Sequence, residues 1–340
     1  MKLQILIPQY KETEEILSPL LKSIELQQNV DLKNDVGVII ANDGSDVILS
    51  DGFLKSFPFE IKYLKCPHRG VSATRNACLD AATAEYVMFC DADDMFYNAC
   101  GLWILFREMN GEGFNALISV FIEETKNFAT GEKMYINREM DTTFVHGKVY
   151  KLSYLRHNNI RWNDNLFIHE DSYFNCLAKS MTDKVKYCQT SFYLWKWRDD
   201  SVCRHDPKYI LKTYPNMLTS NTALVEEFLA RGKQKEAQYY ATSMIFDAYY
   251  MMNKEEWLNQ ENQQYREITE NKFKEYYLKF KPQFEAIPKE IKSQIIMGMK
   301  NRFFREGVFM ETVTFDDWIK HILSLGGEPN EYNDKTGITR

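Results

Sequence analysis

The chain has 340 residues, enough to bury a large core and to form one sizeable domain with a smaller one beside it. Hydrophobic residues make up 44% of the chain and charged residues 26%, which is typical of an ordered, soluble protein and excludes a disordered one. The net charge of −6 argues against a strongly basic face for DNA or RNA.

Cysteine usage and hydropathy indicate where such a protein works. The seven cysteines are scattered and include no CxxC pair, a pattern typical of reduced intracellular thiols and not of a disulfide framework or a zinc site. Pro8 interrupts the N-terminal apolar stretch too soon for a signal peptide. Because no run of about 18 apolar residues occurs, we expect no membrane span. We therefore expect a cytoplasmic protein.

The first quarter of the chain alternates between strand and helix patterns. Apolar runs rich in β-forming residues predict strands over residues 3–7, 36–41, 61–66 and 86–90. Residues 11–28 and 71–80 lie between such runs and have helical character. This alternation predicts an α/β fold with a largely parallel sheet.

Each predicted strand is followed by a polar cluster. The clusters are residues 8–12, 42–46, 68–76 and 91–94. In open parallel sheets, ligands bind beyond the carboxyl ends of the strands, so four such clusters are expected to converge on one site.

The fourth cluster contains three acids, Asp91, Asp93 and Asp94. If the strand geometry continued through them, Asp91 and Asp93 would point to the same side and Asp94 to the other. Two carboxylates on one face at the end of a buried strand suit a hard cation such as Mg²⁺ or Mn²⁺. The alternative is a polar turn in which an Asp caps the next helix.

The middle of the chain extends the sheet and adds a second acidic pair. We expect strands over 116–123, 185–188 and 191–197, with a hairpin over 125–136. Glu170 and Asp171 open a predicted helix. Acids in a first helical turn are also favoured by the helix dipole, which gives this pair an ordinary structural explanation.

Beyond Asp206 the pattern becomes purely helical. The predicted helices are 209–230, 236–252, 256–279, 289–305 and 316–323, and a polar tail follows. The Tyr, Phe and Met residues of this region are expected to form its core.

Taken in order, the motifs of the first 205 residues resemble family-2 glycosyltransferases of the GT-A fold. The matching segments are Pro8–Tyr10, Asn42–Asp46, Gly70–Asn76, Asp91–Asp94, Gly147–Tyr150, Glu170–Asp171 and Arg198–His205. The resemblance implies a Rossmann-like, mainly parallel mixed sheet flanked by helices. We therefore expect a catalytic domain over 1–205, a helical accessory domain over 206–325 and a polar tail over 326–340.

The resemblance also implies a donor site. In this site, a nucleoside pocket would be lined by Pro8, Tyr10 and Glu12, and Asp43 would form a hydrogen bond with the base, usually uracil. Arg75 would contact the nucleotide. Asp91 would lie near the ribose, with Ala92 beside it. Asp93 would bind Mn²⁺ or Mg²⁺ between the two phosphates. His205 would be a further ligand, although a lone His in a polar loop is more often only solvated.

On the acceptor side, the resemblance implies that Asp171 is the general base and Glu170 a supporting group. The two roles could be reversed, because residues adjacent in a helix point about 100° apart and only one normally faces a cleft. His146, Lys148, Arg198 and Ser201 are expected to bind the acceptor or to support the site.

The leading hypothesis is a metal-dependent, inverting glycosyltransferase of the hexosyl or N-acetylhexosaminyl class. It would move a sugar from a nucleotide-sugar donor, expected to be a UDP-sugar, to an acceptor hydroxyl. A nucleotidyltransferase would be expected to have a Gly-rich phosphate loop, which residues 8–12 lack. A non-catalytic binding module would be expected to have lost Asp93 or Asp171.

The acceptor stays open at this stage. A glycan, a wall polymer or another hydroxyl compound fits, and the acidic balance disfavours a nucleic acid. The helical region could bind the acceptor, form a homo-oligomer or dock on a partner.

Overall fold

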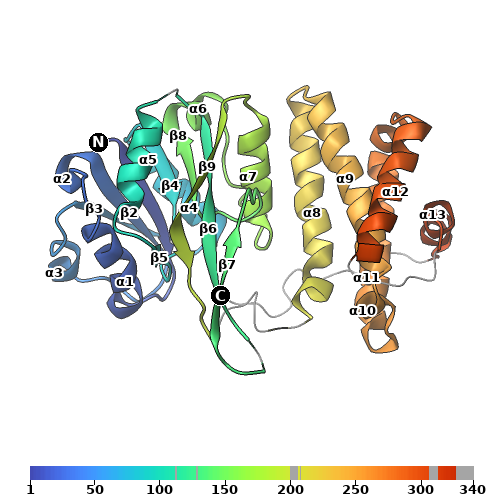
Figure 1. The fold of residues 1–340 in the computed structure, drawn as a ribbon, viewed down its shortest axis with the longest axis horizontal. Helices are drawn as coiled ribbons and strands as arrows, with labels where there is room; N and C mark the ends of the chain where they lie inside the picture. The colour runs from blue at the N-terminus through green and yellow to red at the C-terminus, as the bar shows by residue number, and fades with distance from the viewer. Residues whose placement is uncertain (112, 128, 200–205, 207, 306–312, 327–340) are drawn as a thin grey trace. The chain divides into compact units, whose positions relative to one another are not determined.

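The computed structural model describes the chain except for residues 112, 128, 200–205, 207, 306–312 and 327–340. The chain divides into two compact units, Met1–Asp199 and Asp200–Arg340. The first unit contains the sheet and the second is helical (Figure 1). The division lies six residues before the predicted boundary at residue 205, and the predicted tail falls almost entirely outside the described residues.

Four parallel strands form one half of the sheet. They are β1 (Leu3–Gln9), β2 (Val36–Asp43), β3 (Glu60–Cys66) and β4 (Tyr86–Phe89), and their order in the sheet is β3-β2-β1-β4. α1 (Glu14–Glu25) connects β1 to the β2 region, and α4 (Val71–Ala81) connects β3 to β4. The predicted alternation of strand and helix is therefore confirmed. It brings the carboxyl ends of these four strands to one edge of the sheet.

The other half of the sheet is mixed. β8 (Lys148–Lys151) pairs antiparallel with both β4 and β6 (Ala116–Lys126), and β9 (Val185–Trp195) runs parallel to β6. The short β5 (Met95–Phe96) pairs antiparallel with β9, and β7 (Lys133–Arg138) completes the predicted hairpin with β6. The remaining helices of this unit are α2 (Leu32–Asp35), α3 (Asp51–Leu54), α5 (Gly101–Met109), α6 (Leu152–His157) and α7 (Glu170–Ser180).

Burial of the apolar strands holds this unit together. Ile5, Val38 and Met88, on neighbouring strands, are at most 1% exposed and belong to one continuous hydrophobic core. Each such side chain contributes about 1.5–3 kcal/mol on removal from water. Since β1, β2 and β4 are buried along nearly their whole length, polar side chains gather at their carboxyl ends, where the chain leaves the sheet.

Two sequence expectations about strands were wrong. β4 ends at Phe89, and residues 92–93 form a turn in which the Asp94 amide donates to the Asp91 carbonyl at 3.3 Å. Strand alternation therefore does not decide where Asp91 and Asp93 point. The two segments predicted over 185–197 form the single strand β9, whose pairing with β6 contains an irregularity between Ser119 and Phe121.

The second unit contains the predicted helices. They are α8 (Tyr209–Ala230), α9 (Gln234–Met252), α10 (Glu255–Leu258), α11 (Gln263–Glu285), α12 (Lys289–Arg305) and α13 (Phe315–Ser324), with a short 3₁₀ turn, η1 (Gln260–Asn262), before α11. The helix predicted over 256–279 is divided because Asn259 has an extended backbone and its side chain accepts from the Glu261 amide. Among the described residues, no helix is long and apolar enough to cross a membrane.

Candidate functional site

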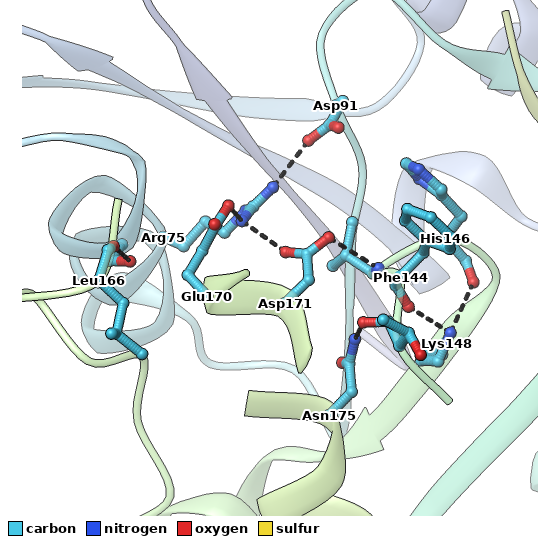
Figure 2. A network of polar contacts seen from close by, with 12 residues as sticks. Arg75, Asp91, Phe144, His146, Lys148, Leu166, Glu170, Asp171 and Asn175 are labelled. Atoms are coloured by element: carbon cyan, nitrogen blue, oxygen red, sulfur yellow. Dashed lines mark hydrogen bonds and ion pairs between the residues drawn. The ribbon is translucent and has the colours of Figure 1, made fainter. Parts of the chain in front are cut away.

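Arg75 is the hub of the polar network at the carboxyl edge of the sheet. It projects from α4, and its side chain is only 2% exposed. Nη2 donates to Asp91 at 3.0 Å, and Nη1 donates to Glu170 at 3.1 Å and to Asp171 at 2.9 Å. Figure 2 shows the guanidinium reaching Asp91 on one side and both α7 acids on the other. Arg75 therefore joins two acidic motifs that lie far apart in the sequence.

Asp171 is held from two directions. Its Oδ1 accepts from Arg75, and its Oδ2 accepts from the backbone amide of Val145 at 3.0 Å, while the side chain keeps 19% exposure. Burial raises the pKa of Asp171 to about 7; Arg75 opposes this increase, and the carboxylates of Glu170 and Asp91 add to it. Glu170 is less accessible, with 7% of its side chain exposed. The more accessible acid with the raised pKa is the one better suited to exchange a proton near neutral pH.

The three acids after β4 face different partners. Asp91, 32% exposed, contacts Arg75, whereas Asp93, 29% exposed, accepts from Arg198 Nη1 at 2.9 Å. Asp94 is buried and accepts from the Tyr193 hydroxyl and the Lys196 amide. Asp91 and Asp93 are thus the carboxylates of this turn that remain partly open to a ligand. Ala92, between them, is 4% exposed.

The loop after β3 is tied by side chains to the end of β2 and to the loop after β1. Asp43, 4% exposed, accepts from the Arg69 and Gly70 amides at 2.8 and 3.0 Å, and it lies 2.9 Å from Nδ1 of His68. The His68 ring stacks on Tyr10 at 4.7 Å. Asp43 therefore shapes the 68–70 loop, and its contact with a base stays a prediction.

Glu12 and Pro8 complete this side of the edge. The Glu12 carboxylate accepts from the Tyr10 amide at 2.5 Å, and burial raises its pKa, with backbone amides opposing the increase. Pro8 is paired with Ala41 at the end of β1. These residues lie at or just after the carboxyl end of β1, and the nucleoside pocket stays a prediction.

His146 and Lys148 are buried beneath the site. His146 is 2% exposed, and its ring stacks on Tyr193 at 5.1 Å and lies tilted against Trp195 at 4.8 Å. Lys148 is 1% exposed and donates to the carbonyls of Phe144 and His146, as Figure 2 shows. Burial lowers the pKa of Lys148 to about 8, although Asp141 and Asp171 oppose the decrease. These positions favour the supporting role over direct contact with an acceptor.

Asp91 and Asp93 offer partly exposed carboxylate oxygens of the kind that a divalent cation prefers. Ligand atoms of Asp91, Asp94 and His146 lie within 4.8 Å of one another. Both Asp94 oxygens already accept from protein donors, which leaves Asp91 and Asp93 as the better carboxylate ligands for a hard cation. The predicted further ligand His205, together with Ser201, lies outside the described residues.

Two residues of the network were not found from the sequence. The Arg75 guanidinium lies over the Trp162 ring at 4.4 Å, and Trp162 in turn stacks on Phe174 at 4.3 Å. Tyr193 connects the turn after β4 to β9. A Trp or Tyr is commonly part of a core, so no local pattern marks either residue as part of a site.

Residues 4–171 match the family model described as glycosyl transferase family 2. The matched region includes Arg75, the Asp91–Asp94 turn and Asp171. The chain belongs to glycosyltransferase family 2. The resemblance in the motifs is thereby confirmed, since the matched residues include Arg75 and its three acidic partners.

Comparisons with individual proteins agree with this family assignment. The chain is 35% identical to the succinoglycan biosynthesis protein ExoM of Rhizobium meliloti over 69 residues, which are 19% of this chain and 22% of ExoM. It is 26% identical to glycosyltransferase GlyA of Streptococcus pneumoniae over 228 residues, which are 60% of this chain and 32% of GlyA. The chain thus spans less than a third of the length of these two relatives.

A solved structure shares the fold. The crystal structure of S. aureus TarS 1–349 in complex with UDP-GlcNAc matches with a TM-score of 0.59 at 15% identity, over 91% of this chain and 93% of TarS 1–349. This likeness confirms the predicted family-2 architecture, a GT-A fold with a helical C-terminal region.

Proposed function

We propose that this chain is an inverting glycosyltransferase that moves a sugar from a nucleotide-sugar donor to an acceptor hydroxyl. The observation that carries the proposal is the bridge formed by Arg75. One guanidinium holds Asp91, at the turn suited to a donor's diphosphate, and Asp171, a carboxylate suited to act as base. Residues 1–205 would form the catalytic domain and residues 206–325 an accessory domain.

In the proposed reaction, Asp171 takes the proton of the acceptor hydroxyl as its oxygen attacks the anomeric carbon of the donor. The bond from that carbon to the diphosphate breaks in the same step, so the configuration inverts. The contacts from Arg75 and Val145 fix both carboxylate oxygens in position and leave the group partly exposed. A pKa of about 7 makes Asp171 a stronger base than an ordinary Asp while keeping it ionised in part at neutral pH.

The proposed donor is a UDP-sugar of the hexosyl or N-acetylhexosaminyl class. TarS, which shares the fold, has been crystallised with UDP and with UDP-GlcNAc. In this chain, the nucleoside would lie among Pro8, Tyr10, Glu12 and Asp43. Asp43 is held by backbone amides and has a defined orientation, which suits recognition of a base.

Asp93 and Asp91 are the proposed ligands of Mn²⁺ or Mg²⁺. Both side chains are about one-third exposed, and carboxylate oxygens are preferred by these cations. When bound, such a cation would stabilise the negative charge that develops on the leaving diphosphate. Arg198, which contacts Asp93, would add positive charge on the same side.

The proposed acceptor is a hydroxyl group of a glycan or wall polymer. ExoM is named for succinoglycan biosynthesis, which supports a glycan product. The partly exposed face of Asp171 is where the acceptor hydroxyl would meet the base.

A thermal-shift screen of UDP- and GDP-sugars, with and without Mn²⁺, tests the donor assignment. We expect metal-dependent stabilisation by one UDP-sugar, because a ligand that binds only the folded state raises the melting temperature. The stabilising donor is then incubated with oligosaccharide acceptors, and released UDP is measured. Release of pyrophosphate in place of UDP would show a nucleotidyltransferase, and stabilisation by no nucleotide sugar would contradict the proposal.

A further inference from the structure

Asp94 lies deeper than the other acids of its turn and has a distinct set of contacts. Its side chain is 1% exposed. Oδ2 accepts from the Tyr193 hydroxyl at 2.5 Å, and Oδ1 accepts from the Lys196 amide at 2.9 Å. Both donors come from the end of β9 or just beyond it, about 100 residues later in the chain. A buried carboxylate that accepts on both oxygens connects two segments firmly, since neither donor has water as a substitute.

Tyr193 also contacts the beginning of the same turn. Its hydroxyl oxygen accepts from the Asp91 amide at 3.2 Å while its proton is donated to Asp94. One phenol therefore fixes both ends of the Asp91–Asp94 turn. The connection continues into backbone pairing, because Met95 lies opposite Leu194 and Phe96 opposite Tyr193.

The same contacts fix the arginine that faces Asp93. Lys196 precedes Arg198 by two residues, and Arg198 donates to Asp93 at 2.9 Å. At the other end of the turn, Arg75 donates to Asp91. The outer acids thus face side-chain cations, whereas Asp94 holds the backbone that presents them.

We propose that Asp94 is a positioning residue, which acts with the Tyr193 hydroxyl to lock the Asp91–Asp94 turn to the end of β9. The lock fixes Asp91 and Asp93 in the orientation that the donor diphosphate needs. This inference rests on the proposed function for its effect on donor binding, but the lock itself can be measured independently. Asp94 is not assigned as a metal ligand, because both of its oxygens already accept from protein donors.

Two variants break the lock in different ways. Asp94→Ala removes both acceptor oxygens, and Tyr193→Phe removes only the hydroxyl while keeping the ring against His146. Asp94→Asn keeps one acceptor oxygen and serves as the conservative rescue. Ser23→Ala is the matched control, because the buried Ser23 hydroxyl accepts from the Phe96 amide at 2.9 Å on the side of α1 and touches neither Asp94 nor Arg198.

Hydrogen exchange, measured by mass spectrometry on the full chain, tests whether these contacts hold the turn to β9, and it does so independently of activity. Asp94→Ala and Tyr193→Phe should both speed exchange in peptides covering 90–95 and 193–198. Ser23→Ala should speed it at β5 alone. Unchanged exchange over 193–198 in both lock variants would overturn the proposal, whether or not the protein transfers sugar.

Steady-state kinetics then test the consequence for the donor. We expect the donor KM to rise roughly 10- to 100-fold in Asp94→Ala and about 10-fold in Tyr193→Phe, with smaller changes in kcat. Asp94→Asn should raise the donor KM less than Asp94→Ala does. Ser23→Ala should keep the wild-type KM even if its melting temperature is lower. A wild-type donor KM in both lock variants would contradict the inference. Absence of transfer by the wild-type protein would contradict only the proposed function.

Discussion

Arg75 and Asp171 are 96 residues apart in the sequence, yet Nη1 of the arginine lies 2.9 Å from Oδ1 of the carboxylate. The same guanidinium also contacts Asp91 and Glu170, so one cation faces three acids. A buried carboxylate that shares its counter-ion with two others is harder to ionise, which agrees with the raised pKa of Asp171. The contact between these two residues therefore affects both the geometry and the proton affinity of the proposed base.

Replacing the proposed base should stop transfer and spare donor binding. Asp171→Asn keeps the shape and an oxygen for Arg75 but cannot accept the acceptor's proton. We expect kcat to fall by about 10²–10⁴-fold, the usual contribution of a general base. Donor affinity, measured by calorimetry, should stay within a few-fold of the wild-type value. Glu170→Gln is the matched comparison and should lose much less; a larger loss in Glu170→Gln than in Asp171→Asn would reverse the two roles.

The rate of transfer should depend on pH through Asp171. Its pKa is raised to about 7, and only the ionised form can act as base, so kcat/KM should fall about tenfold for each pH unit below 7 and level off above it. The residual rate of Asp171→Asn should lack this acidic limb. Donor binding measured at the same pH values separates an effect on the base from one on the donor site. A wild-type rate that is constant from pH 5.5 to 8 would exclude Asp171 as base.

Removal of divalent cations should weaken donor binding through Asp93. After treatment with EDTA, we expect UDP-sugar affinity to drop and to return with Mn²⁺ or Mg²⁺. Asp93→Asn should lower affinity at saturating metal and shift the metal requirement to higher concentration. Asp51→Asn removes the same charge from an exposed side chain in α3 and should change neither. Equal donor affinity with and without metal would show that Asp91 and Asp93 do not hold a cation.

Arg75→Lys should destabilise the first unit more than an ordinary surface change. Lysine keeps the charge but cannot span Asp91, Glu170 and Asp171 at once, so buried acids lose a partner. We expect the free energy of unfolding to fall by about 3 kcal/mol, as for other broken buried ion pairs. Arg161→Lys is the control: Arg161 contacts Asp80 through two nitrogens but is 41% exposed, and its loss should stay below about 1 kcal/mol. Urea unfolding of the full-length variants measures both.

The secondary structure could largely be predicted from the sequence because its signals are local. Apolar runs that end in turn residues predicted β1 and β2, and helical spacing predicted α8 and α12 with the bounds that they have. Such patterns depend on neighbours within a few residues, which the sequence shows directly. The division of the helix predicted over 256–279 was missed because one extended residue, Asn259, decides it.

The site was predicted as a set of motifs and not as a set of contacts. Arg75 was expected to face a nucleotide, but in the structure its described partners are three acids 16 to 96 residues away. His146 and Lys148 were expected to bind the acceptor or to support the site. Both are buried, His146 against aromatic rings and Lys148 against backbone carbonyls, which the sequence did not indicate. Partners this distant are set by topology and packing, which no local pattern encodes. The argument that placed Asp91 and Asp93 on one face does not apply, because β4 ends at Phe89, before both residues.

The pairing of Met95 with Leu194 has a consequence during synthesis. A ribosome that adds about 5–20 residues per second needs roughly 5–20 s to make the intervening segment. Throughout that time β5 has emerged without β9, and the acids next to it have no fixed orientation. The nascent chain can build its parallel half early, but under the proposed function it would bind a donor diphosphate only when β9 arrives. A product truncated before residue 185, where β9 begins, would contain most of the family motifs and still lack the strand that fixes the turn.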